Sequence, residues 1–97
     1  MPGNTPTTLG NERYVGTEQI TSLSTVKSLT VPDNARAAVL IPETQAVRVA
    51  FDGATPTSAD PLLYAGQDLT VTTREDLANV RLIEDAASAT VKVLYFG

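Results

Sequence analysis

The sequence is built from short segments in which apolar side chains recur at every second position and which end at turn-forming residues. The clearest central example is residues 46–51, where Val47, Val49 and Phe51 alternate with other residues before Asp52-Gly53. Successive side chains of an extended strand point to opposite faces, so these three side chains should share one face. Such a pattern is typical of strands that bury one face and expose the other.

The composition agrees with a β fold. There are 14 Thr and 10 Val residues, and these β-branched side chains suit pleated strands and lose rotamer freedom in helices. No helical pattern long enough to form a βαβ crossover lies between the strand patterns. We therefore expect an all-β protein.

About seven or eight short strands are expected, with turn signals at roughly eight- to twelve-residue intervals, which is the spacing of a β-sandwich or small barrel. The main strand patterns cover residues 26–31, 35–41, 46–51, 62–64, 69–73, 80–83 and 89–96. A helix is the competing interpretation for the apolar run 35–41, but Pro32 and Pro42 leave too little room for one. Thr73 can cap one helical turn by accepting from Asp76. The pattern therefore predicts a small antiparallel β-sandwich or barrel.

The first 16 residues should form a flexible or extended N-terminal arm, and the β-sandwich domain should occupy residues 17–97. The arm is rich in Gly, Pro and polar residues, so it buries too little apolar surface to repay its ordering. One interpretation is a free tail. The other is an arm that docks on a neighbouring subunit through Leu9, Tyr14 and Val15.

Several function classes are unfavourable for this composition. The chain has no Cys and no His, which excludes thiolate chemistry, Cys/His zinc sites and imidazole catalysis. Its net charge of −4 has the wrong sign for binding nucleic-acid phosphates. No apolar run approaches the ~20 residues that span a bilayer. We expect no nucleic acid, membrane or small-molecule substrate as a partner.

Three strands place a cation between two aliphatic residues, at Arg48, Arg81 and Lys92. If these strands lie in one sheet, the cations form a stripe on its outer face. The stripe is then either an ordinary solvated surface or a surface that meets an acidic partner, with electrostatics steering the encounter.

The acidic residues do not form a catalytic pair. The pairs Glu75-Asp76 and Glu84-Asp85 are neighbours in sequence, so on a strand they would point to opposite faces. A calcium site built from Asp52, Asp60 and backbone carbonyls is a minor alternative. There is no Gly-x-Ser-x-Gly elbow and no His base, so we expect a protein without enzymatic activity and without a cofactor.

Residues 26–97 also carry a family resemblance. The segments that carry it are Leu29-Thr30-Val31-Pro32, Ala37 to Ile41, Val47-Arg48-Val49-Ala50-Phe51-Asp52-Gly53-Ala54-Thr55-Pro56-Thr57, Leu63-Tyr64-Ala65-Gly66-Gln67-Asp68-Leu69, Val80-Arg81-Leu82-Ile83 and Val91-Lys92-Val93-Leu94-Tyr95-Phe96. In this order they resemble small structural proteins of tailed-bacteriophage virions, which include β-sandwich capsid cement, or decoration, proteins and head–tail components. The Asp-Gly-x-x-Pro-Thr element is the most specific part.

The resemblance implies a non-enzymatic virion protein with a small antiparallel β-sandwich or jelly-roll fold. Such a protein is made in the bacterial cytoplasm and placed on the capsid surface. The implied partner is the major capsid protein, and a homotrimer would suit local three-fold positions of a shell. An adhesive module associated with the tail, baseplate or fibre is the alternative. A carbohydrate-binding module is a third class, but it normally uses aromatic platforms, and this chain has no Trp and 3 Tyr.

Overall fold

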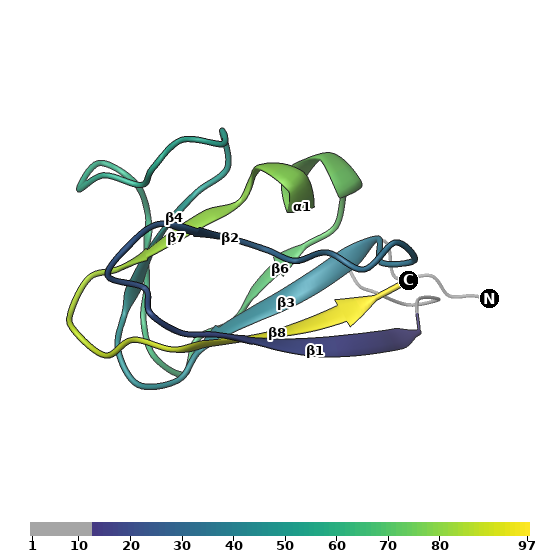
Figure 1. Ribbon diagram of the computed structural model, residues 1–97, viewed down its shortest axis with the longest axis horizontal. Coiled ribbons are helices and arrows are strands. Elements are labelled where there is room, and N and C mark those ends of the chain that lie inside the picture. The colour runs from purple at the N-terminus through teal and green to yellow at the C-terminus, as the bar shows by residue number, and fades with distance from the viewer. Residues whose placement is uncertain (1–12) are drawn as a thin grey trace.

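The computed structural model describes residues 13–97, which form two antiparallel sheets packed face to face and one short helix (Figure 1). The strands are β1 (Tyr14–Ile20), β2 (Lys27–Ser28), β3 (Ala37–Pro42), β4 (Val47–Ala50), β5 (Leu62–Leu63), β6 (Leu69–Val71), β7 (Arg81–Glu84) and β8 (Val91–Phe96), and the helix is α1 (Arg74–Asn79). The first sheet has the order β1-β8-β3-β6 and the second the order β2-β7-β4-β5. The expected small all-β fold is confirmed.

The strand pairs are nested along the chain. β1 pairs with β8, β2 with β7, β3 with β6 and β4 with β5, and these pairs alternate between the two sheets. Pairing of β8 with β3 and of β7 with β4 completes the sheets. Eight strands in two such sheets form a jelly roll, because a long antiparallel ribbon has been folded over on itself.

The core lies between the two sheets and is apolar throughout. Within residues 13–97, no polar or charged residue is classed as buried. The last strand shows the alternation most clearly, because Val91, Val93 and Tyr95 are buried while the residues between them are half-buried. Fully burying an aliphatic side chain contributes roughly 1.5–3 kcal/mol, so this row of three is a large share of the stability of a small domain.

The central strand is shorter than its sequence pattern predicts. β4 ends at Ala50, and Phe51 is 40% exposed instead of joining Val47 and Val49 in the core. The chain turns there because Gly53 adopts a positive φ of 78° and donates its amide to the Asn79 carbonyl oxygen. The expectation that Phe51 lies in the core row is therefore wrong.

The helix follows the predicted cap and extends further than expected. The Thr73 hydroxyl accepts a hydrogen bond from the Asp76 amide at 3.1 Å, and α1 continues to Asn79 rather than stopping after one turn. Leu77 is buried and holds the helix against the core. The helix carries the chain from β6 in the first sheet to β7 in the second.

The sheet begins three residues earlier than the expected domain boundary. Residues 14–16 lie in β1 and not in a separate arm, because β1 pairs with the end of β8. This pairing closes with two hydrogen bonds between Arg13 and Gly97, at 2.9 and 2.8 Å. Residues 1–12 of the predicted arm, including Leu9, lie outside the described residues.

Candidate partner-binding surfaces

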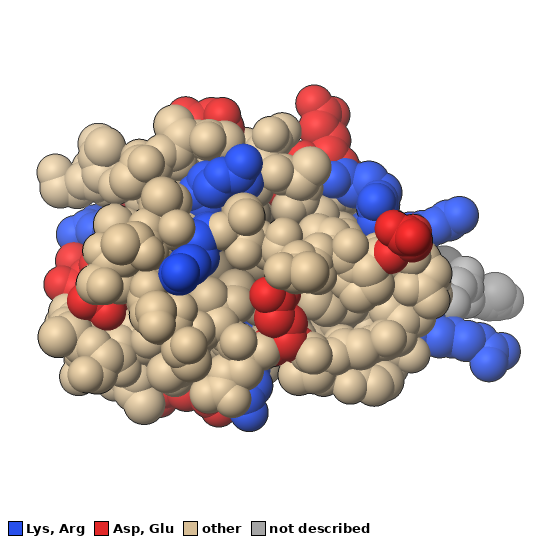
Figure 2. Space-filling model, in the orientation of Figure 1, with Lys and Arg blue, Asp and Glu red and all other residues tan. Residues whose placement is uncertain are grey.

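The three predicted cations do not form one stripe. Arg48 lies on β4 and Arg81 on β7 of the second sheet, whereas Lys92 lies on β8 of the first. Figure 2 shows Lys and Arg groups at separate places on the visible face, several of them beside acidic groups. The expected single stripe is wrong because its premise, that all three strands share a sheet, does not hold.

Each of these cations has an intramolecular contact. Arg48 donates to the Asp60 carbonyl oxygen at 3.0 Å and lies 3.5 Å from the Asp85 carboxylate. Arg81 donates to backbone carbonyl oxygens at the end of α1, and Lys92 lies 3.7 Å from Glu43. Pairs this exposed contribute about 0–1 kcal/mol. Arg48 therefore helps to hold the loop at Asp60, and Arg81 helps to hold the end of α1, while both side chains remain partly exposed to solvent.

Of the predicted arm residues, Tyr14 and Val15 are placed at the start of β1. Tyr14 is 59% exposed, and its ring meets Phe96 edge-on with centroids 6.2 Å apart. Val15 is half-buried and packs against the core. Tyr14 is thus available to a partner, whereas Val15 already contributes to the fold.

β1 is the longest strand within residues 13–97 and forms one edge of the first sheet. It has 7 residues, while β2 and β5, the edge strands of the second sheet, have 2 each. Within residues 13–97, no strand pairs with the outer edge of β1. An edge strand presents unpaired amides and carbonyls that can accept a further strand. The β1 edge is therefore the best-formed backbone docking surface of the described chain.

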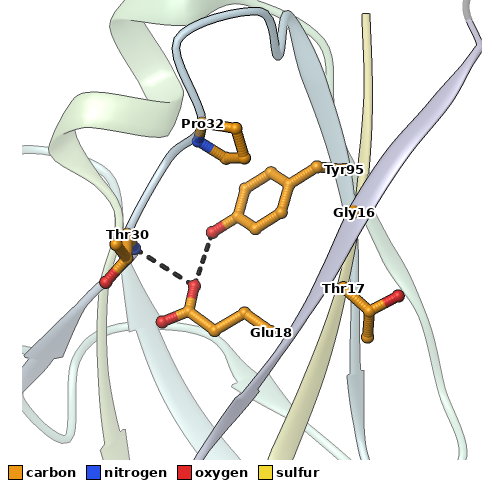
Figure 3. A pocket seen from close by; sticks show the side chains of 6 residues that line it. All are labelled: Gly16, Thr17, Glu18, Thr30, Pro32 and Tyr95. Carbon is orange, nitrogen blue, oxygen red and sulfur yellow. Dashed lines mark hydrogen bonds between the residues drawn. The ribbon is translucent and has the colours of Figure 1, made fainter.

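A pocket opens beside β1, between the two sheets. It has a volume of about 340 Å³ and is lined by Gly16, Thr17, Glu18, Thr30, Pro32 and Tyr95 (Figure 3). Gly16 lies directly opposite Tyr95 in the β1–β8 register, and a Cβ atom at Gly16 would meet nothing within 4 Å. The missing side chain at Gly16 therefore leaves space beside the Tyr95 ring.

The polar part of the pocket is centred on Glu18. One carboxylate oxygen, Oε1, accepts from the Tyr95 hydroxyl at 2.7 Å and from the Thr30 amide at 3.1 Å. These two bonds tie β1 to β8 and to the segment after β2. Burial raises the pKa of the Tyr95 phenol well above its ordinary value, and the hydrogen bond to Glu18 and the Glu18 charge raise it further.

The two aspartates of the minor calcium alternative hold their own loop. Asp52 accepts from the Ala54 amide at 3.1 Å, and Asp60 accepts from the Thr57 amide at 2.8 Å. Residues 13–97 contain no group of three or more acidic side chains placed to hold a metal ion. In the same part of the chain, no helix has the length and apolar character to cross a membrane.

Sequence analysis did not identify the pocket residues. A signal existed, because Gly16, Glu18 and Ile20 alternate along β1 and a charged residue within an inward row is unusual. The Gly- and Pro-rich composition of residues 1–16 favours an arm, and the boundary at Gly16 divides this alternation.

Comparison of the chain with protein-family models, with curated proteins and with solved structures gives no match. The function is therefore argued from the fold and from the surfaces described above.

Proposed function

We propose that this chain is a non-enzymatic structural protein of a tailed-bacteriophage virion, in which homotrimers bind the major capsid protein as a cement, or decoration, protein. The observation that carries this proposal is the 7-residue β1 edge, which has no strand partner within residues 13–97 and lies beside the pocket. Such an edge can add a strand from a neighbouring subunit through backbone hydrogen bonds.

The jelly-roll topology gives support at the level of the fold. Double-sheet jelly rolls recur in viral capsid domains and also in lectins. Because one fold hosts many functions, this support is an analogy, and the surface is the more specific observation. A lectin would bind sugars through aromatic platforms, and the tyrosines Tyr14 and Tyr64 are exposed on separate segments, β1 and the turn after β5.

Cementing follows physically from many repeated weak contacts. A compact module that engages neighbouring capsid subunits makes each further contact intramolecular, so modest interactions add up over a shell. A homotrimer would match local three-fold positions of the shell. The shell would then resist the outward pressure of the packaged DNA.

The test is the copy number and position of the chain in purified virions. Quantitative gel densitometry should give a number of copies per particle comparable to that of the major capsid protein, and immunogold labelling should cover the head. A few copies confined to one vertex would instead assign the chain to the tail, baseplate or fibre. Particles that contain none of the chain would contradict both assignments.

A further inference from the structure

Only one of the two Glu18 carboxylate oxygens accepts hydrogen bonds from residues 13–97. Both hydrogen bonds to it, from Tyr95 and from Thr30, end on Oε1. In Figure 3 the second oxygen carries no hydrogen bond to the residues drawn and points away from the Tyr95 hydroxyl. Within residues 13–97, no Lys or Arg forms an ion pair with Glu18. The pocket therefore contains a negative charge whose free oxygen can accept a further hydrogen bond.

The walls around this carboxylate are largely apolar. The Tyr95 ring, Pro32 and the backbone at Gly16 border the space beside it. A suitable occupant needs a narrow apolar stem to lie against the ring and a positively charged donor at its end. Lys and Arg side chains have this form, since their methylene stems bury against apolar surface while the charged head reaches a polar partner.

We propose that the pocket beside β1 binds a Lys or Arg side chain of the major capsid protein, with the stem against Tyr95 and Pro32 and the cationic head on Glu18. This inference rests on the proposed function and names the chemistry of its partner. Charge complementarity supports a cationic occupant, because the chain has a net charge of −4 and one of its carboxylates, Glu18, lies in the pocket without an ion pair to any Lys or Arg of residues 13–97. Binding also needs no rearrangement, because Tyr95 and Thr30 already hold Glu18 in place.

The direct test uses a small probe and needs no virion. Backbone amide NMR spectra of the full chain are recorded during titration with N-acetyl-arginine amide, and with N-acetyl-citrulline amide as the neutral analogue of the same shape. We expect saturable shifts at Gly16, Thr17 and Thr30 with the arginine probe, with a dissociation constant of about 1–10 mM. The citrulline probe should bind about 10-fold more weakly.

Two variants separate the charge from the cavity. Glu18→Gln keeps the oxygen that accepts from Tyr95 and Thr30 but removes the charge, so the arginine probe should bind about 10-fold more weakly. Gly16→Leu fills the space beside Tyr95, where an added Cβ meets nothing within 4 Å, and should abolish the shifts. Glu75→Gln, at an exposed position on α1 outside the pocket, is the matched control and should bind like the wild type.

The proposal is overturned if the arginine probe gives no saturable shift at these amides, or if Glu18→Gln binds it as tightly as the wild type. Equal binding of both probes would also overturn it. These outcomes are independent of the virion copy number, so the pocket assignment can fail while the cement assignment stands. If both hold, capsids stripped of the chain should bind Glu18→Gln more weakly than Glu75→Gln.

Discussion

The Tyr95 side chain extends from the core to the Glu18 carboxylate in the pocket. Tyr95 is 1% exposed, yet its hydroxyl reaches the half-buried Glu18 at the sheet edge. Tyr95→Phe keeps the ring and removes this hydrogen bond. We expect a loss of about 1 kcal/mol in the free energy of unfolding, measured by urea denaturation.

The exposed Tyr64 provides the matched control for this experiment. It is 57% exposed, so Tyr64→Phe should change the free energy of unfolding by less than about 0.5 kcal/mol. Equal effects of the two substitutions would mean that the Glu18 bond contributes nothing measurable.

The raised pKa of Tyr95 also makes stability depend on pH in the alkaline range. Because the folded phenol holds its proton more tightly than the unfolded one, its contribution is complete below the ordinary tyrosine pKa of about 10 and is lost as the pH rises above it. Urea midpoints should therefore fall above about pH 10. The fall should be shallower in Tyr95→Phe, and an unchanged fall would assign it to other groups.

Gly66 and Gly16 allow the effect of backbone strain to be measured separately from that of steric space. Gly66 has a φ of 87°, which is unfavourable for other residues, although a Cβ there would meet nothing within 4 Å. Gly16 has the same open space and is not among the positive-φ residues of the described chain. Gly66→Ala should cost about 1 kcal/mol, whereas Gly16→Ala should be neutral or slightly stabilising. Thermal unfolding of both variants checks this difference.

Sequence patterning predicts residues best where a strand is buried on one face. Alternation predicts that Val47 and Val49 share one face of a half-buried strand, and both are buried. Alternation does not predict the role of Glu18 in the pocket, because that role depends on a hydrogen bond from Tyr95, which is 77 residues away in the chain. Alternation identifies which face a residue occupies but not which residue lies opposite it.

At the scale of single elements, α1 depends on its N-cap. The helix has 6 residues, too short to be stable by itself, so the Thr73 cap and buried Leu77 decide whether it forms. Thr73→Ala should lower the free energy of unfolding by about 1 kcal/mol. The exposed neighbour Thr72 is the control, and Thr72→Ala should change it by less than about 0.5 kcal/mol. Urea denaturation of both variants is the measurement, and equal losses would exclude the cap as the cause.

Strands are predicted less accurately where the sequence pattern and the strand pairing in the structure disagree. The run 35–41 is nearly continuously apolar, which is typical of a strand covered on both faces. In β3, however, the outward residues Val39 and Ile41 are only half-buried. The pattern at 26–31 predicted a full strand, but only Lys27–Ser28 pairs with β7, while Leu29 and Val31 pack on the core. A strand assignment needs a paired neighbour as well as an alternating sequence, and the neighbour is set by tertiary structure.

At the scale of the whole molecule, the nested pairing could not be derived from the sequence. β1 and β8 lie at opposite ends of the described chain, yet they pair with each other, for example at Ile20 and Val91. No local pattern specifies such a pair, because many antiparallel arrangements bury the same alternating faces. The same limit explains why Arg48 and Lys92, which share a strand motif, lie in different sheets.

The β1 edge leads to a prediction about assembly. Light scattering of the isolated chain should give three times its mass of 10.2 kDa, as expected for a homotrimer. Gln19 is an exposed residue of this edge strand, so Gln19→Lys should shift the population toward the monomer, because Lys on an edge strand discourages strand addition. Ser58→Lys, at an exposed loop position, adds the same charge away from the edge and should leave the trimer intact. A wild-type monomer would contradict the homotrimer, whereas a trimer insensitive to Gln19→Lys would place the subunit interface elsewhere and leave β1 free for the capsid.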